Sequence, residues 1–408
     1  MQNSSFRVLS PAAIFFGNGC SKQIGPVAKT MMGVDKAVIF CDKDIFNSGL
    51  LKGIEASLTG FDVAYDIYSE VVPNPTHSSI MKAAQFIIDA KADIVIAVGG
   101  GSSMDTAKVA RAMTVAPPPI SQYVDVEGAI KGRPIPQISV PTTAGTGAEA
   151  TAGGVVADDN THIKGIVSGL HLMAMGAFVD PELTISLPPR LTASTGMDAL
   201  THAIEGCSSQ FRNPVADLYH FEAIRLIAAN LRTAYADGKD INARYNMLLG
   251  ATLAGLAVGS TSCGAAHGFA YPLESDWRIS HGEANAAMLP AVMRHNAPAV
   301  APIYRKVAEL MGENVAGLSD RAAAMVAVDA VQQLAADVHI PTLAEHGITE
   351  KDVEDLAITV MSMTRALGNN TTFVTMYDAK KIYTEALGTT VSTKDGAGKA
   401  DEEDEEDY

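Results

Sequence analysis

The first half of the chain alternates short apolar runs with segments of helical periodicity. Runs rich in Val, Ile and Ala predict strands at residues 37–42, 62–69, 93–101 and 134–143. Helix-like segments follow the first three runs, and such alternation is typical of a parallel sheet with crossover helices. From Leu191 to about Leu387 helical periodicity dominates, with faces rich in Ala, Leu and Met. The pattern predicts an α/β N-terminal domain with a parallel sheet at residues 1–187 and an all-α C-terminal domain at residues 188–388.

Length and charge narrow the class of protein. The chain has 408 residues, which is too long for one ordinary hydrophobic core and favours two domains. Hydrophobic residues make up 47% and charged residues 19%, so sizeable cores can form. The formal net charge of -16 argues against a surface that binds nucleic acid or an anionic membrane. Part of this charge is local, because residues 401–407 are all acidic, and residues 389–408 are predicted to be an acidic disordered tail.

Three further features indicate a cytoplasmic protein without a membrane partner. The four cysteines are scattered and form no CxxC pair, which is typical of a reducing compartment and argues against a zinc ribbon. The first residues contain one early Arg and a short apolar stretch, so they make a poor signal peptide. Residues 246–275 are long enough to span a bilayer, but their second half is rich in Gly, Ser, Thr and Ala. We therefore expect a buried core helix in this stretch.

Two loops rich in Gly, Ser and Thr follow consecutive predicted strands. The segment VGGGSSMDTAK contributes Gly99, Gly100 and Gly101, which allow backbone N–H groups to approach a phosphate at a helix N-terminus. The segment PTTAGTGAEAT supplies hydroxyls from Thr142, Thr143 and Thr146. Ligands bind outside the carboxyl ends of strands in such sheets, and two neighbouring loops suit a dinucleotide better than one. A glycine-rich turn with serine capping is the alternative interpretation of the first loop.

Asp42 lies at the end of the first of these predicted strands. An acidic side chain at this place commonly binds a ribose 2′-hydroxyl and repels a 2′-phosphate, which favours NAD over NADP. The alternative is that Asp42 only caps the helix that follows.

A candidate metal site lies in the second half. Asp198 and His202 are four residues apart in a helical segment, so they share one face of the helix. His267 and His281 follow fourteen residues apart, each beside glycines. One carboxylate and three imidazoles suit Fe²⁺, Zn²⁺, Mn²⁺, Co²⁺ or Ni²⁺ and leave a position open for a substrate oxygen. The alternative for a histidine in so apolar a stretch is an ordinary core residue.

A family resemblance joins these patterns. In order, GGGSSMDTAK, PTTAGTGAEAT, VDPELT, LPPRLTASTGMDALTHAIEG and HGFAYPLESDWRISHGEANAAMLP resemble the iron-containing (group III) alcohol dehydrogenases. The similarity extends from about residue 6 to residue 388. It implies a Rossmann-like N-terminal domain and a helical C-terminal domain in a dehydroquinate synthase-like fold, with the active site in the cleft between them. It also implies a homodimer or larger homo-oligomer.

The resemblance also implies which residues form the site. It implies that the ligands of Fe²⁺ are Asp198, His202, His267 and His281. It places Asp42 at the adenine ribose of NAD, and it implies that the rest of the coenzyme site comprises Gly99, Gly100, Gly101, Ser102, Asp105, Thr142, Thr143, Thr146 and Lys164.

Two positions depart from the family pattern. The family usually has a second His four residues after the third ligand, often assigned a proton-relay role, and Tyr271 stands there. Tyr271 either takes over the relay or is a plain aromatic of the pocket wall. The loop ESDWRIS carries Glu274, Asp276 and Arg278, where the family more often has uncharged residues. Arg278 either holds an anionic substrate tail or is solvated on the surface.

The sequence thus predicts an NAD(H)- and metal-dependent alcohol dehydrogenase or aldehyde reductase for small primary alcohols or aldehydes. The metal would polarise the substrate oxygen, and NAD would carry the hydride. The alternative substrate is a small anionic aldehyde, such as sulfoacetaldehyde, phosphonoacetaldehyde or succinic semialdehyde. Two rival classes are a lyase of the dehydroquinate synthase type and a non-catalytic protein built on the same fold.

Overall fold

The N-terminal half folds around one parallel sheet. The computed structural model describes residues 5–388 except residue 162, so the predicted tail at 389–408 lies outside the described residues. The sheet has six strands in the order β1-β8-β5-β4-β2-β3, and every neighbouring pair is parallel. These strands are β1 (Ala13–Phe16), β2 (Lys36–Phe40), β3 (Ala64–Tyr68), β4 (Ile94–Gly99), β5 (Gln137–Pro141) and β8 (Gly176–Val179). The predicted α/β fold class is confirmed.

The four predicted strands are present as β2, β3, β4 and β5, each shorter than its apolar run. Four other strands were not predicted. β1 and β8 have only four residues each, and β6 (Gly153–Ala157) and β7 (Lys164–Ser168) form an antiparallel pair with glycines in both strands. Strands so short or so rich in glycine lack the longer runs of Val, Ile and Ala on which the strand predictions depended.

Alternate residues of the central strands enter two different cores. In β2, Val38 and Phe40 pack on one face of the sheet, and Ala37 and Ile39 pack on the other. Both faces are therefore covered, as expected for a parallel sheet. The helical segments of this domain are α1 (Ile24–Pro26), α2 (Lys43–Ser48), α3 (Lys52–Gly60), α4 (His77–Ala90) and α5 (Gly101–Met113), with short turns η1 (Cys20–Gln23), η2 (Val27–Met31), η3 (Ile120–Tyr123), η4 (Ala148–Ala150), η5 (Leu170–Leu172) and η6 (Pro181–Thr184).

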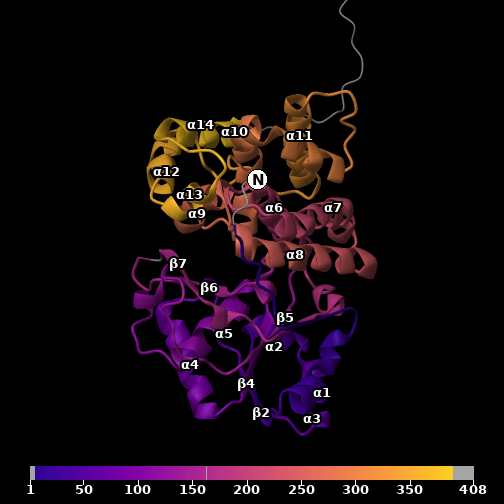
Figure 1. Ribbon diagram of the computed structural model, residues 1–408, viewed down its shortest axis with the longest axis vertical. Helices are drawn as coiled ribbons and strands as arrows, with labels where there is room; N and C mark the ends of the chain where they lie inside the picture. Colours follow the sequence, from indigo (N-terminus) through magenta and orange to yellow (C-terminus); the bar gives the residue numbers. More distant parts are fainter. Residues whose placement is uncertain (1–4, 162, 389–408) are drawn as a thin grey trace, which may run out of the picture.

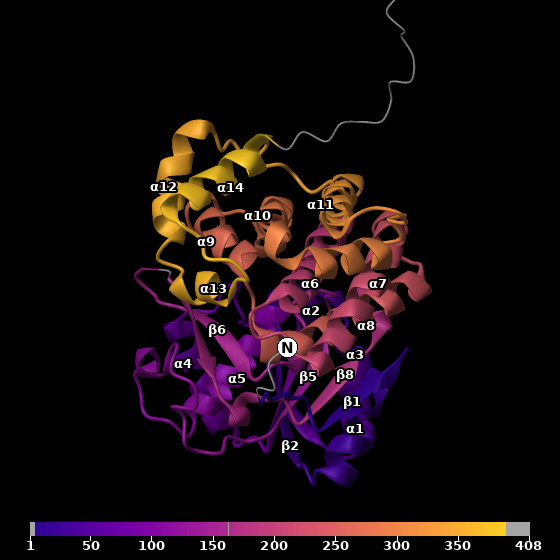
Figure 2. The same ribbon diagram turned by 45° about the horizontal axis from the view of Figure 1, so that its top comes forward.

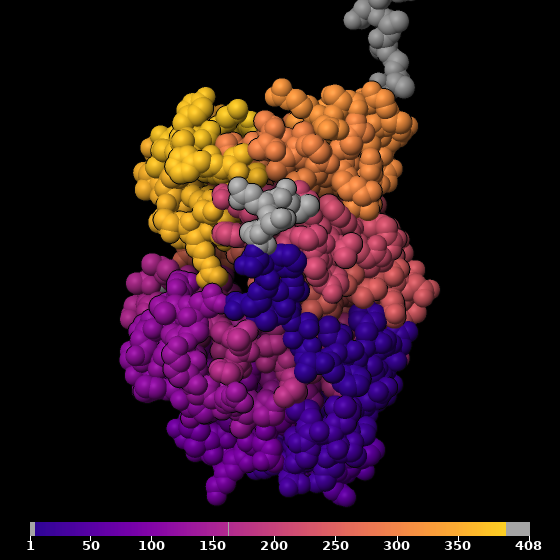
Figure 3. Space-filling model, viewed as in Figure 1, coloured from indigo at the N-terminus to yellow at the C-terminus, as the bar shows by residue number. Residues whose placement is uncertain are grey.

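The second half is helical from Pro189 onward (Figures 1 and 2). Its central helix is α6 (Pro189–Ser208), which packs against three long neighbours and is buried along most of its length. The other elements are α7 (Pro214–Ala236), α8 (Ile241–Thr261), α9 (Ala265–Trp277), α10 (His281–Leu310), α11 (Asp320–Asp337), η7 (Glu350–Asp352), α12 (Val353–Val360), α13 (Thr364–Asn369) and α14 (Met376–Gly388). Figure 3 shows the helical half above the α/β half, with an indentation between them on the left side of the view.

The apolar stretch at 246–275 is divided between α8 and α9, which meet at 105°. Among the described residues, no single helix has the length and apolar character needed to cross a membrane. Most of α8 from Met247 to Val258 is buried, as expected for a core helix.

The loop after β5 touches the helical domain directly. The Oγ1 atom of Thr252 on α8 donates to the buried Glu149 carboxylate over 2.7 Å. At the same contact, a Cβ on Gly147 would lie 2.5 Å from the Cα of Gly255, and Gly147 has a φ of +60°. Only a glycine fits there, because both the close backbone approach and the left-handed conformation exclude a side chain. The loop that carries Thr142, Thr143 and Thr146 is thereby fixed against α8.

Candidate metal and coenzyme site

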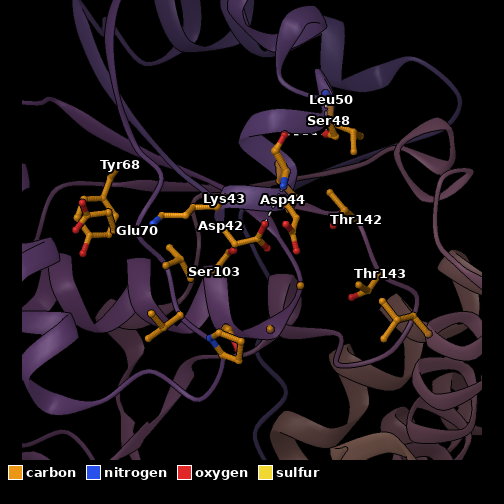
Figure 4. Close-up of a pocket in the computed structure, with 18 of the residues that line it drawn as sticks. Asp42, Lys43, Asp44, Ser48, Leu50, Tyr68, Glu70, Ser103, Thr142 and Thr143 are labelled. Carbon is orange, nitrogen blue, oxygen red and sulfur yellow. Dashed lines mark hydrogen bonds between the residues drawn. The ribbon is translucent and has the colours of Figure 1, made fainter.

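A cavity of about 910 Å³ opens at the carboxyl ends of β2, β4 and β5 (Figure 4). This is the edge at which open α/β sheets bind ligands, and the volume is in the range of known ligand pockets. The residues predicted for the coenzyme that line it are Asp42, Gly100, Gly101, Ser102, Thr142 and Thr143. The structure therefore brings together two Gly/Thr loops that are forty residues apart in the chain.

Gly99 and Thr146 stand behind the cavity wall and hold the two loops together. Gly99 has a φ of +150°, and a Cβ there would lie 2.3 Å from the Ser103 Oγ. A Cβ on Gly101 would lie 2.9 Å from the Thr146 Cγ2. The backbone N–H of Thr142 donates to the Gly99 carbonyl over 3.0 Å. These glycines therefore allow the loops to pack closely enough to expose backbone at the start of α5.

Asp42 fits both interpretations of its role. Its Oδ1 accepts a hydrogen bond from the Ile45 N–H over 2.8 Å, so it is the N-cap of α2. The same residue lines the cavity and is drawn beside Ser103 in Figure 4. The cap orients the carboxylate at the cavity wall and does not exclude a ribose contact.

Two residues predicted at the coenzyme site lie outside this cavity wall. The Asp105 carboxylate accepts from the Val155 N–H over 3.0 Å and lies 3.8 Å from the Lys108 Nζ, so it is turned toward β6. Lys164 lies on β7, where its Nζ pairs with the Glu274 carboxylate of the helical domain. Asp105 therefore supports the strand that packs on α5, and Lys164 belongs to the contact between the domains.

The four predicted metal ligands converge from three helices. Asp198 and His202 lie one turn apart on α6, His267 is in the first turn of α9, and His281 begins α10. The Asp198 oxygens lie 3.5 Å from the His281 Nε2, 3.8 Å from the His267 Nε2 and 4.0 Å from the His202 Nδ1. A tetrahedral ion about 2.1 Å from each donor would separate the donors by about 3.4 Å, so these spacings are close to those that a cation requires.

The buried polar atoms of this cluster also suit a cation. In the part of the chain that the structure describes, the His202 Nδ1 and the His267 Nε2 are buried without a hydrogen-bond partner. Such atoms are costly unless something binds them. The Asp198 side chain is 3% exposed and that of His281 is 43% exposed, so the cluster opens on the His281 side.

Charges around the cluster keep Asp198 ionised. Burial alone would raise the pKa of Asp198, but His202, His281 and His267, with a hydrogen bond from Asn285, hold it below its ordinary value. The Asn285 Nδ2 donates to the Asp198 Oδ1 over 2.8 Å and lies 3.1 Å from the His281 Nε2. An ionised carboxylate facing imidazole nitrogens is the donor set that a divalent cation prefers.

Sequence reasoning missed several residues around the ligands. Glu205 accepts from the His267 Nδ1 over 2.6 Å, and Asn285 contacts both Asp198 and His281. Glu205 is three residues after His202, so helical spacing could have placed it beside the site. Cys263 also has its donor atom within 4.8 Å of those of His202 and His267. Burial raises the Cys263 pKa, but the two histidines outweigh it and lower the pKa to about 6.

The four residues that depart from the family pattern differ in burial and in partners, and Asp276 is exposed. The Tyr271 hydroxyl accepts from the Lys164 N–H over 3.3 Å, and burial, followed by Glu274 and Asp276, raises the Tyr271 pKa. Burial opposes ionisation of Glu274, but His281 and Lys164 lower its pKa to about 2. Arg278 is exposed at the C-terminus of α9, with a left-handed backbone at φ 54°.

Two family models match the chain. The model for iron-containing alcohol dehydrogenase matches residues 11–181, and the model for the C-terminal part of the Fe-containing alcohol dehydrogenase family matches residues 192–387. A long-chain-alcohol dehydrogenase 1 of Geobacillus thermodenitrificans is 35% identical over 388 residues, which is 94% of this chain and 98% of that protein.

Solved structures agree with these matches. A 1,3-propanediol oxidoreductase superposes with a TM-score of 0.91 at 33% identity, covering 94% of this chain and 100% of that chain. A sulfoacetaldehyde reductase from Bifidobacterium kashiwanohense, solved with NAD⁺, gives a TM-score of 0.85 at 28% identity, covering 95% and 100%. With both halves matched by family models and a relative above 30% identity along nearly its whole length, the chain belongs to the iron-containing alcohol dehydrogenase family.

Proposed function

We propose that the protein is an NAD(H)- and metal-dependent alcohol dehydrogenase or aldehyde reductase for small primary alcohols or aldehydes. The observation that carries this is the meeting of Asp198 with three imidazoles, two of which have buried nitrogens without a partner. The cavity in the α/β domain, which is large enough for a dinucleotide, supports the same reaction. Membership of the family supports it as well.

The proposed metal ligands are Asp198, His202, His267 and His281. When bound, a divalent cation supplies Lewis acidity toward an alcohol or carbonyl oxygen. Glu205 and Glu274 accept from the Nδ1 atoms of His267 and His281, which directs the opposite nitrogens at the cluster. We propose Fe²⁺ as the metal from the family, although the same donors suit Zn²⁺, Mn²⁺, Co²⁺ or Ni²⁺.

The coenzyme is proposed to lie along the cavity wall. Backbone N–H groups at the start of α5 would face the pyrophosphate, and Asp42 would face the adenine ribose. Gly99 and Thr146 allow the two loops to pack closely against each other on the side away from the cavity. Asp105 would contribute indirectly, because its carboxylate accepts from the Val155 N–H of β6.

Tyr271 is proposed to act as a neutral phenol. Its raised pKa makes a phenolate unfavourable near neutral pH, so its hydroxyl can orient the β7 backbone or a bound molecule by hydrogen bonding. For the alternative substrate, an anionic aldehyde, Arg278 is proposed to hold the anionic tail, a role that its exposed position allows; with a neutral aldehyde it is a solvated surface residue. We further propose that the enzyme acts in the cytoplasm, with the α/β domain at 1–187 and the helical domain at 188–388, as a homodimer or larger homo-oligomer.

Oxidation of NADH by iron-loaded protein under anaerobic conditions tests the function. The aldehydes would be propionaldehyde, 3-hydroxypropionaldehyde, lactaldehyde, succinic semialdehyde, sulfoacetaldehyde and phosphonoacetaldehyde. We expect turnover that a chelator abolishes and a neutral aldehyde as the best substrate. A tenfold higher kcat/KM for the anionic aldehydes, which is about 1.4 kcal/mol, would instead assign them as the substrate class. Stoichiometric NADH oxidation without turnover, or none at all, would contradict the proposal.

A further inference from the structure

Glu274 stands out among the charged residues at 274–278, where α9 ends. The segment that the sequence predicts as a loop is mostly the last turn of this helix. Asp276 and Arg278 are exposed, whereas the Glu274 side chain is 9% exposed. It lies seven residues after His267 on α9, which is two helical turns and therefore the same face of the helix. A carboxylate so deeply buried requires partners, because an unpaired buried charge is strongly unfavourable.

Each oxygen of Glu274 has its own partner. Oε1 accepts from the His281 Nδ1 over 2.6 Å, and Oε2 pairs closely with the Lys164 Nζ. His281 begins α10 of the helical domain, whereas Lys164 begins β7 of the α/β domain. A second contact joins α9 to β7, since the backbone N–H of Lys164 donates to the Tyr271 hydroxyl over 3.3 Å. One carboxylate therefore links a proposed metal ligand to the opposite domain.

We propose that Glu274 is a positioning residue that orients His281 toward the metal and holds Lys164 of the α/β domain at the same time. The inference rests on the proposed function for the identity of the metal cluster. With Nδ1 donating to Glu274, the His281 ring directs Nε2 at the cluster, where it lies 3.5 Å from the Asp198 Oδ1. A carboxylate behind a histidine ligand fixes its tautomer and its ring orientation.

The same carboxylate joins the helical domain, which holds the metal cluster, to the α/β domain, which holds the coenzyme cavity. An arrangement of Glu274 that holds His281 therefore also holds Lys164. Because coupling between two binding equilibria is reciprocal, coenzyme binding that stabilises the position of β7 would also favour metal binding. Glu274 thereby acts at a distance from the reacting atoms, through His281 and Lys164.

Glu274→Gln is the direct test, because it keeps the size and removes the charge. The amide oxygen can take the place of only one of the two carboxylate oxygens, so the NH₂ group faces the donor of the other partner. The matched control is Asp276→Asn, which removes a nearby exposed carboxylate that contacts neither His281 nor Lys164 in the described structure. The measurements are Zn²⁺ affinity by competition with a chromophoric chelator and NADH affinity of the zinc-loaded protein by fluorescence titration.

We expect Glu274→Gln to weaken Zn²⁺ binding by about tenfold or more and NADH binding severalfold, with Asp276→Asn within twofold of the parent in both. Parental Zn²⁺ affinity in Glu274→Gln would overturn the role at His281. Weakened Zn²⁺ binding with parental NADH affinity would overturn the link to Lys164.

A spectroscopic readout on the parent protein does not depend on whether the variant folds. With ¹⁵N-labelled histidine and bound Zn²⁺, the His281 signal, assigned by its loss in His281→Ala, should show a proton on Nδ1 and metal on Nε2. Metal on Nδ1 would overturn the inference. The proposed function fails separately: a parent without aldehyde turnover but with a zinc-binding defect in Glu274→Gln would remove the function and leave the positioning role.

Discussion

The His267 Nδ1 lies 2.6 Å from the Glu205 Oε2, although the two residues are 62 positions apart in the chain. Glu205 also accepts from the N–H groups of Gly264 and Ala266, so one buried carboxylate closes the turn that begins α9. This arrangement fixes the His267 ring with Nε2 directed at Asp198. Both oxygens of Glu205 are thereby used in placing a proposed metal ligand.

Replacing Glu205 with Gln should weaken metal binding by about 10- to 100-fold, because an amide presents a donor where N–H groups already point. Zn²⁺ affinity by chelator competition measures the effect. Glu222→Gln, an exposed member of an ion pair on α7, is the control and should retain parental affinity. Parental affinity in Glu205→Gln would show that His267 is held by its helix alone.

Gly101→Ala should weaken NADH binding by roughly tenfold, because the added Cβ would lie 2.9 Å from the Thr146 Cγ2 and force the two loops apart. Thr146→Ser removes that methyl group and should restore affinity in the double variant. Gly53→Ala on α3, where the nearest atom is 3.9 Å away, is the control. Equal NADH affinity in Gly101→Ala and the parent would show that this loop contact does not shape the coenzyme site.

Asp42→Asn separates the two interpretations of Asp42. Asn caps a helix about as well as Asp, so α2 should remain stable by circular dichroism. Loss of the negative charge should raise the kcat/KM for NADPH relative to NADH by about tenfold, since the 2′-phosphate is no longer repelled. An unchanged coenzyme ratio would leave Asp42 as a helix cap only.

Lys108→Met should lower the urea midpoint of unfolding, and by a larger amount at pH 9.5 than at pH 7. The fully buried Lys108 Nζ donates to the Ala148 and Gly153 carbonyls, which would lose their donor. Burial lowers the pKa of Lys108 from 10.5 to about 8, so the unfolded chain holds one more proton between these values. The free energy of unfolding of the parent therefore rises by up to roughly 3 kcal/mol between about pH 8 and pH 10.5. The variant has no lysine at this position and lacks this rise.

Unfolding at both pH values, with the exposed Lys381→Met as control, gives the comparison for Lys108. A difference between Lys108→Met and parent that is the same at pH 7 and pH 9.5 would mean that Lys108 stays charged in the folded protein. A midpoint equal to that of the parent would remove its structural role altogether.

Local sequence patterns were sufficient to predict several strands, one face of α6 and the loops that line the cavity. Short apolar runs predicted β2, β3, β4 and β5, because strands of a parallel sheet that is covered on both faces read as nearly continuous apolar runs. Helical spacing placed Asp198 and His202 on one face of α6, and the glycine-rich segments marked the loops that line the cavity. The family followed from the order of these motifs.

Contacts between distant segments depended on the tertiary structure. Asp105 lies in a coenzyme motif, yet its carboxylate faces β6 because α5 packs that side on the strand. Glu274 and Arg278 are four residues apart, but the end of α9 turns one inward and leaves the other exposed. Sequence spacing determines which face of its own helix a residue occupies, whereas the packing of helices and strands determines what that face meets. The sequence alone therefore determined the fold class, four of the strands and the types of the candidate ligands, and only the fold decided which carboxylates stand behind the histidines.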